Sequence, residues 1–296
     1  MTNTMKRLTF PFMLCVMLVS SCNNDQDQSD AFGNFEAVDV MVAAEAQGKL
    51  IAFTPMEGQE INEGEIVGVI DTTQLFLKKQ QLLAAITTLQ TKVKTLDAQV
   101  KANVVQMENL EREYNRLLNL LEDGAATSKQ KDDMDGNIKV LKAQIAALET
   151  QKATISAERN TLKIQIAQVN DQIKRSQVKN PISGVVLQKY KEQGEIVGAG
   201  QNLYKIADLD KLILRVYVSG DQLSTVKIGE EVTVRIDGTE GIEELPGLVT
   251  WVSSQAEFTP KIIQTKEERI NLVYAVKVVV ENDGMLKIGM PGEIKL

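Results

Sequence analysis

The sequence predicts an elongated protein of mixed α and β structure, in which a small split β-sandwich is interrupted by a coiled-coil hairpin and followed by a small β-barrel. Two stretches, near residues 48–70 and 184–206, repeat one spacing of glycine and apolar residues. A long heptad pattern separates them, and short alternating segments follow residue 209. The 296 residues exceed what one hydrophobic core usually organises, so several modules are expected.

The composition excludes several classes of function. Lysine and arginine total 33 against 40 aspartates and glutamates, without a run of like charge, so the basic stripe that nucleic-acid binding needs is missing. The chain has no histidine and two cysteines, which argues against imidazole bases, zinc sites and disulfide frameworks. An enzyme would have to work with carboxylates, lysines and hydroxyls alone. We expect no enzyme, no cofactor and no bound metal.

The first residues have the pattern of a secretory signal peptide, expected over residues 1–21. A basic Lys6-Arg7 pair precedes an apolar run from Leu8 to Val19, which is too short to span a membrane comfortably. The tetrapeptide that ends at Cys22 resembles the lipobox of bacterial lipoproteins, which implies lipidation of Cys22. The alternative is a plain secreted protein with an incidental cysteine. Residues 22–35 are expected to be a lipidated tether, because residues 23–30 offer nothing that could pack.

The repeated stretches are predicted to be the two halves of the sandwich, residues 36–72 and 178–208. One constant offset aligns the three glycines of the first half with three glycines of the second, together with three apolar positions. Strands are expected at 49–53, 65–70, 185–190 and 201–206, and each half leaves an unpaired edge unless it meets the other. The six glycines predicted to lie in turns are Gly48, Gly58, Gly64, Gly184, Gly194 and Gly200.

The heptad pattern predicts an antiparallel helical hairpin over residues 73–177, with its tip near residues 122–128. Gly124 suits a helix end, and Thr127 or Ser128 suits the start of the next helix. Each arm of about 47 residues would reach ~70 Å, longer than a globular core requires. A lone polar core residue such as Asn103 more often fixes register than binds a ligand. Lys152 and Arg159 at core positions could mark a contact between hairpins, but long side chains that extend to solvent are the more common explanation. The first seam comprises Leu75, Leu82, Ile86, Leu89, Val93, Leu96, Val100, Met107, Leu110, Tyr114, Leu117 and Leu121, and the second Met134, Ile138, Leu141, Ile145, Leu148, Ile155, Leu162, Ile166, Val169 and Ile173.

Residues 209–296 are predicted to form the β-barrel. Apolar residues alternate with polar ones at 212–218 and 232–236, and further strands are expected at 248–253 and 271–280. Gly229, Gly238, Gly247 and Gly284 are interpreted as separators between short strands, as in small barrels.

The order of half-motif, hairpin and half-motif resembles the HlyD and AcrA family of periplasmic adaptors, also called membrane fusion proteins. Residues Asn180–Val186 are similar to the second-half signature of its split biotinyl-lipoyl-like domain, and Gly289–Lys295 resembles the closing strand of its barrel. The hairpin occupies the place of the lysine-bearing turn of true lipoyl domains, so no lipoyl or biotin attachment is expected. The family's membrane-proximal domain is expected to be reduced or absent. Residues 258–274 are similar to adaptors that serve ABC-type exporters.

The resemblance also implies a docking site at the hairpin tip. Family members that dock on a TolC-like outer-membrane channel carry an arginine, a leucine four residues on and a serine seven further. The corresponding residues here are Arg116, Leu120 and Thr127, followed by Ser128, with threonine in place of serine. The alternative is that Arg116 is a solvated flank of the coiled coil and that Thr127 only caps a helix.

The family implies an adaptor anchored by lipid to the inner membrane of a Gram-negative bacterium and facing the periplasm. Its partners would be an inner-membrane transporter (ABC-type favoured, RND possible), a TolC-like channel and copies of itself in a ring of six or of three pairs. The alternative function is a structural coiled-coil envelope lipoprotein without a transport role, which would have no reason to carry a split β module. Asp132, Asp133 and Asp135 could suggest a metal site, but near a helix start such carboxylates more often favour the macrodipole.

Overall fold

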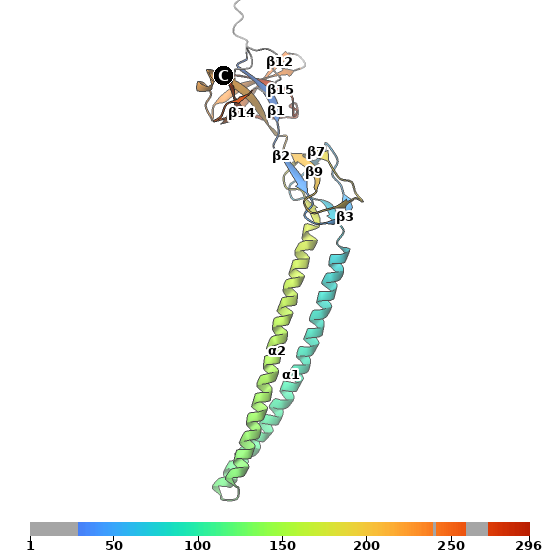
Figure 1. Cartoon of the computed structure of the whole chain (residues 1–296), viewed down its shortest axis with the longest axis vertical. Helices are drawn as coiled ribbons and strands as arrows, with labels where there is room; N and C mark the ends of the chain where they lie inside the picture. The colour runs from blue at the N-terminus through green and yellow to red at the C-terminus, as the bar shows by residue number, and fades with distance from the viewer. Residues whose placement is uncertain (1–28, 239–240, 259–271) are drawn as a thin grey trace, which may run out of the picture. The chain divides into compact units, whose positions relative to one another are not determined.

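A computed structural model describes residues 29–238, 241–258 and 272–296. The chain divides into two compact units, one formed by residues 41–206 and the other by residues 1–40 with 207–296. The first unit contains the hairpin and the sandwich, and the second contains the barrel (Figure 1). The predicted fold class, with its hairpin, split sandwich and barrel, is confirmed. The expected signal peptide and the proposed lipid site at Cys22 lie outside the described residues.

The hairpin consists of α1 (Thr73–Glu122) and α2 (Ser128–Arg175), which run side by side in Figure 1. Every residue of the two predicted seams is buried or half-buried, and so are the polar core residues Asn103, Lys152 and Arg159. Leu89, Leu96 and Ile155 form the most buried part of the seam. The 3.5-residue spacing therefore predicted correctly which face of each helix meets the other.

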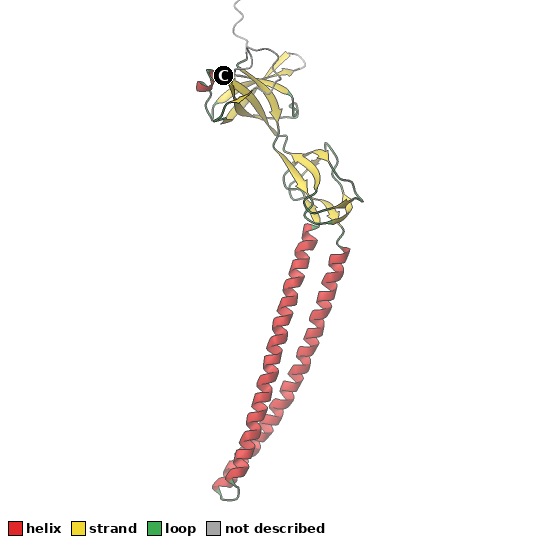
Figure 2. Ribbon diagram, in the orientation of Figure 1, coloured by secondary structure: helices red, strands yellow, loops and turns green. Residues whose placement is uncertain are grey.

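The sandwich has two four-stranded sheets, ordered β2-β9-β7-β4 and β6-β5-β3-β8. The hairpin is inserted between β5 and β6, and Figure 2 shows the strands of the sandwich in yellow and the hairpin in red. Strands β2 to β5 come from the first half and β6 to β9 from the second, so each sheet combines both halves. The bounds are β2 Asp39–Ala43, β3 Gly48–Phe53, β4 Glu60–Ile61, β5 Ile66–Ile70, β6 Gln177–Lys179, β7 Gly184–Lys189, β8 Ile196–Val197 and β9 Asn202–Ala207.

The two halves exchange equivalent hydrogen bonds. The Gly58 N–H donates to the Val186 carbonyl (2.8 Å), and the Gly194 N–H donates to the equivalent Leu50 carbonyl (2.7 Å). The same correspondence relates the register pair Gly48 with Val197 to the pair Ile61 with Gly184. The repeat that is visible in the sequence is thus a repeat of backbone pairing, and neither half completes its pairing without the other.

The predicted turn glycines fall into two groups. Gly58, Gly64, Gly194 and Gly200 have φ angles of 82°, 79°, 97° and 82°, the left-handed region in which a side chain is strained. Gly48 and Gly184 instead begin strands β3 and β7, so the prediction that they lie in turns is wrong. A Cβ atom at position 48 would lie 2.8 Å from the Ile70 side chain, so the strand approaches Ile70 closely at this glycine.

The barrel closes through six strands. Its sheet has the order β10-β1-β15-β11-β12-β14-β13, and β10 also pairs with β14. The buried apolar residues described in the barrel are mostly aliphatic, and Leu214, Val278 and Ile294 are fully buried. The bounds are β1 Ala31–Glu36, β10 Lys211–Ser219, the 3-10 helix η1 Gln222–Ser224, β11 Glu231–Gly238, β12 Gly241–Val252, β13 Glu257–Phe258, β14 Leu272–Glu281 and β15 Pro291–Lys295.

Two details of the barrel differ from the sequence prediction. The tether was expected over residues 22–35, but residues 31–36 form β1, which pairs with β10 and β15 and buries Ala31 and Phe35. Gly247 was interpreted as a separator, yet it lies inside β12. A Cβ at Gly247 would lie 2.5 Å from the Val278 side chain and 2.7 Å from that of Val234, so this glycine makes room in a crowded interior.

Candidate functional site

The first helix ends at the hairpin tip in a Schellman motif. Gly124 has a φ of 72°, and its N–H donates to the Leu121 carbonyl (3.1 Å). The Ala125 N–H donates to the Leu120 carbonyl (2.8 Å), which gives the second hydrogen bond of the motif. The turn is therefore fixed by backbone bonds, as expected from the glycine.

The second helix begins with a capping box. Thr127 is the N-cap, its backbone N–H donates to Gln130 Oε1 (2.9 Å), and its hydroxyl accepts from the Gln130 N–H (3.4 Å). The Thr127 hydroxyl also donates to Gln130 Oε1 (3.0 Å). Thr127 thus has the capping role that the sequence left as an alternative, and Ser128 is the first residue of the helix.

The residues predicted to dock lie on the surface of the tip. Arg116, Leu120, Thr127 and Ser128 are all exposed, and the Leu120 side chain keeps 47% of its surface accessible. Arg116 and Leu120 are one turn apart on α1 and share a face, while the neighbouring Leu117 and Leu121 turn toward α2. The tip therefore offers a guanidinium, an exposed leucine and hydroxyls at the end of a long hairpin.

The acidic residues after the tip do not gather into a metal site. Asp135 forms an ion pair with Lys139 (2.6 Å), one turn further on, which raises the pKa of Lys139. Within residues 29–238, 241–258 and 272–296, no group of three or more aspartate, glutamate, histidine or cysteine side chains is placed to hold a metal ion.

The polar seam residue Lys152 makes an ion pair across the hairpin. Its Nζ lies 2.8 Å from Asp97 on α1 and 3.1 Å from Glu149 on α2. The hydrogen bond to Asp97, followed by that to Glu149, raises the pKa of Lys152. The aliphatic part of the lysine packs in the seam while the ammonium reaches its surface, as expected from the sequence.

A buried polar cluster joins the two halves of the sandwich. Asn180 is 1% exposed, and its Nδ2 lies within hydrogen-bonding distance of the carbonyls of Ile61 (3.1 Å), Asn62 (3.0 Å) and Ile182 (2.7 Å). The buried Tyr204 hydroxyl donates to Asn180 Oδ1 (2.9 Å), and burial raises the pKa of Tyr204, so the hydroxyl stays protonated. Asn180 lies within the signature that resembles the second half of a lipoyl-like domain, but its role in joining the halves is not visible in the sequence.

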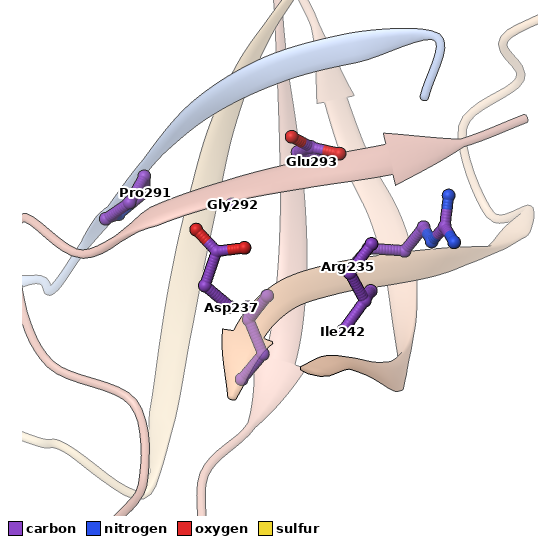
Figure 3. Close-up of a pocket in the computed structure, with 7 residues that line it drawn as sticks. Arg235, Asp237, Ile242, Pro291, Gly292 and Glu293 are labelled. Atoms are coloured by element: carbon purple, nitrogen blue, oxygen red, sulfur yellow. The ribbon is translucent and has the colours of Figure 1, made fainter. Parts of the chain in front are cut away.

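The barrel has a small cavity where β11, β12 and β15 meet (Figure 3). Its volume of about 40 Å³ exceeds the ~10–15 Å³ that a site for one water molecule needs. Figure 3 shows Asp237 and Glu293 beside it, while the Arg235 side chain extends away from Asp237. This cavity is too small for an organic substrate.

Among the described residues, no helix combines the length and the apolar character needed to cross a membrane.

The chain thus combines a split sandwich, an inserted helical hairpin with an exposed tip, and a six-stranded barrel. Residues 38–209 match the protein-family model for the barrel-sandwich hybrid domain of RND membrane fusion proteins. The chain therefore belongs to the membrane fusion protein family, the periplasmic adaptors of efflux systems.

The chain is similar to known proteins over most of its length. A UPF0194 membrane protein of Yersinia enterocolitica is 25% identical over 299 residues, which cover 91% of each chain. One from Acidithiobacillus ferridurans is 25% identical over 288 residues, 88% of this chain and 84% of the relative. The fold is similar to that of MacA from Actinobacillus actinomycetemcomitans (TM-score 0.58, 20% identity, 89% of this chain and 76% of MacA). It is also similar to that of the membrane fusion protein Spr0693 of Streptococcus pneumoniae (TM-score 0.53, 15% identity, 89% of this chain and 96% of Spr0693).

Proposed function

We propose that this protein is a lipid-anchored periplasmic adaptor that links an inner-membrane transporter to a TolC-like outer-membrane channel. The observation that carries the proposal is a helical hairpin with arms of 50 and 48 residues, inserted into a split sandwich and ending in an exposed, well-capped tip. At about 1.5 Å per residue each arm extends ~70 Å, which suits a part that spans distance. The function is mechanical, and its parts are the hairpin, the sandwich and the barrel, which includes residues 31–36.

Copies of the chain assemble into a ring, of six or of three pairs, so that the hairpins enclose a path across the periplasm. One hairpin cannot enclose a conduit, and a module that repeats around an axis closes such a path without further components. The state of the transporter would then be coupled to opening of the channel through this ring.

The tip docks on the channel through Arg116 and Leu120, supported by Thr127 and Ser128. The guanidinium can donate a forked hydrogen bond to carbonyls or carboxylates of a partner helix, and Leu120 adds apolar contact. Thr127 fixes the turn through its capping box, and the exposed Ser128 hydroxyl lies beside it. Substitution of Arg116 or Leu120 would thus weaken docking without unfolding the tip.

The acyl chains on Cys22 hold the protein at the periplasmic face of the inner membrane. The transporter is ABC-type, a choice supported by the resemblance of residues 258–274, of which 259–271 lie outside the described part of the chain. The competing candidate is an RND transporter, which the name of the matching family model favours.

Affinity purification of the tagged full-length chain from detergent-solubilised envelopes tests this function. Mass spectrometry of the purified material should find an ABC-type transporter and an outer-membrane channel. An RND transporter would shift the assignment to the competing candidate. The absence of any transporter would favour a structural lipoprotein. Cys22→Ser is the matched control, and it should release the protein from the membrane fraction while leaving its fold intact.

A further inference from the structure

The two outer faces of the sandwich are equivalent positions of the internal repeat, yet they differ in charge. We define face one as Lys49, Ile51 and Ile196, on the sheet that contains β3 and β8. Face two consists of the equivalent positions Val185, Leu187 and Glu60, on the sheet that contains β7 and β4. Both faces point away from the sandwich core, because the alternate residues Leu50 and Val186 are buried.

Face one exposes aliphatic surface beside a lysine. Ile51 is 50% exposed and Ile196 is 78% exposed, and Lys49 is paired in register with Ile196. Two aliphatic residues this exposed on one face of a sheet are more typical of a contact surface than apolar residues scattered singly.

Face two also combines one charged residue with two aliphatic ones, but its charge is negative and lies at a different position of the repeat. Glu60 is exposed and paired in register with Val185, which is half-buried like Leu187. The lysine of face one therefore occupies the position where face two has valine, and the glutamate of face two occupies the position where face one has isoleucine.

We infer that face one of one copy packs against face two of the next copy, and that this contact builds the ring. The inference rests on the proposed function. When the two faces approach with Lys49 opposite Glu60, the same approach sets Ile196 opposite Val185 and brings Ile51 beside Leu187. Every member of one face then meets a chemically suitable member of the other.

Contacts between identical faces are less favourable. When face one meets face one in the same way, Lys49 lies opposite Ile196. When face two meets face two, Glu60 lies opposite Val185. In both contacts the charged group loses water without gaining a charged partner from the other copy. The two faces lie on opposite sheets of one sandwich, so a face-one to face-two contact is head-to-tail. A head-to-tail contact generates a ring when its rotation closes.

Disulfide trapping in cells distinguishes the two kinds of contact. One copy carries Ile51→Cys and a second, differently tagged copy carries Leu187→Cys. The mixed pair should give a heterodimeric adduct, whereas each variant expressed alone should not. Adducts from either variant alone would overturn the head-to-tail contact, as would their absence from the mixed pair. Val140→Cys, on the exposed side of α2, replaces Ile51→Cys as the control and should give none.

Charge reversal provides the second test, with native mass spectrometry of the full chain as the measurement. Lys49→Glu and Glu60→Lys should each weaken self-association by about fivefold or more, because a rim ion pair becomes a like-charge contact. The double variant should recover most of the loss, and failure to recover would contradict the pairing. If the transporter still co-purifies while these tests fail, the inference fails and the proposed function stands.

Discussion

Asn180 is expected to hold the two halves of the sandwich together, and Asn180→Ala measures how strongly. The amide side chain of Asn180 contacts carbonyls of the first half and of its own loop, and it accepts a hydrogen bond from the buried Tyr204 hydroxyl. The equivalent residue of the first half is Ala44, which is also buried but has no such side chain. The substitution therefore removes a bond network that the internal repeat does not duplicate.

The expected cost follows from the groups that lose a partner. The Tyr204 hydroxyl is left buried without its acceptor, and an unsatisfied buried polar group costs about 1–3 kcal/mol. The Ile61 carbonyl loses a donor and a small cavity forms, so we expect a total loss of about 2–4 kcal/mol. Tyr204→Phe should cost about 1–2 kcal/mol, because Asn180 Oδ1 loses one hydrogen bond.

Native-state hydrogen exchange is the suitable assay, since the chain has two units and one melting temperature would mix them. For amides of β5, β7 and β9, the free energy of opening that hydrogen exchange reports should fall by the costs estimated above for each variant. The exchange of amides of β10 and β14 in the barrel should not change. The double variant Asn180→Ala with Tyr204→Phe should cost less than the sum of the single variants, because both substitutions remove the same bond.

The exposed Asn202 provides a matched control, because Asn202→Ala removes the same side chain at the start of β9 and should change protection by less than about 0.5 kcal/mol. The reasoning would be refuted if Asn180→Ala had an effect as small as that of Asn202→Ala. Strict additivity of Asn180→Ala and Tyr204→Phe would show that the two residues do not act together.

Three further predictions concern backbone conformation and capping. Gly194→Val should destabilise the sandwich and the ring by roughly 1–2 kcal/mol or more, because the φ angle of Gly194 is 97°. Far-ultraviolet circular dichroism should keep its helical signal, and unchanged assembly would count against this turn. Gly136→Ala should stabilise α2 by about 0.5–1 kcal/mol in exchange experiments, because no atom within 4 Å opposes the methyl group; a loss of protection would contradict that reasoning. Thr127→Ala should lower the stability of the α2 start by about 1 kcal/mol, whereas Thr127→Ser should retain most of it; equal effects would exclude the hydroxyl as the cap.

Regular patterns made most of the fold predictable from the sequence. The heptad spacing identified the seam of both helices, and the constant offset between Leu50 and Val186, or Ile61 and Val197, identified positions that are all buried. These features are local or periodic, so they are visible without knowing which strands pair. The tip could likewise be located from Gly124 and Thr127, since both residue types have strong local preferences at helix ends.

The features that the sequence did not reveal depend on contacts between distant residues. The strand at residues 31–36 belongs to the barrel because its partners lie near residues 213–217 and 291–294, and nothing local indicates that pairing. Gly247 resembled a turn glycine because its crowding comes from side chains on neighbouring strands. The role of Asn180 arises from carbonyls more than a hundred residues away, since its partner Ile61 lies across the inserted hairpin.

Photo-crosslinking from the hairpin tip in living cells tests the central claim most directly. A photoreactive residue at position 120 or 127, followed by mass spectrometry of the adduct, identifies what the tip touches. The proposed function predicts an outer-membrane channel in the adduct, and Arg116→Ala should reduce its yield. The same probe at the exposed position 164, at a distance from the tip, is the control and should not capture the channel. Capture from the tip of only another copy of the chain, or of peptidoglycan-associated proteins, would contradict the account.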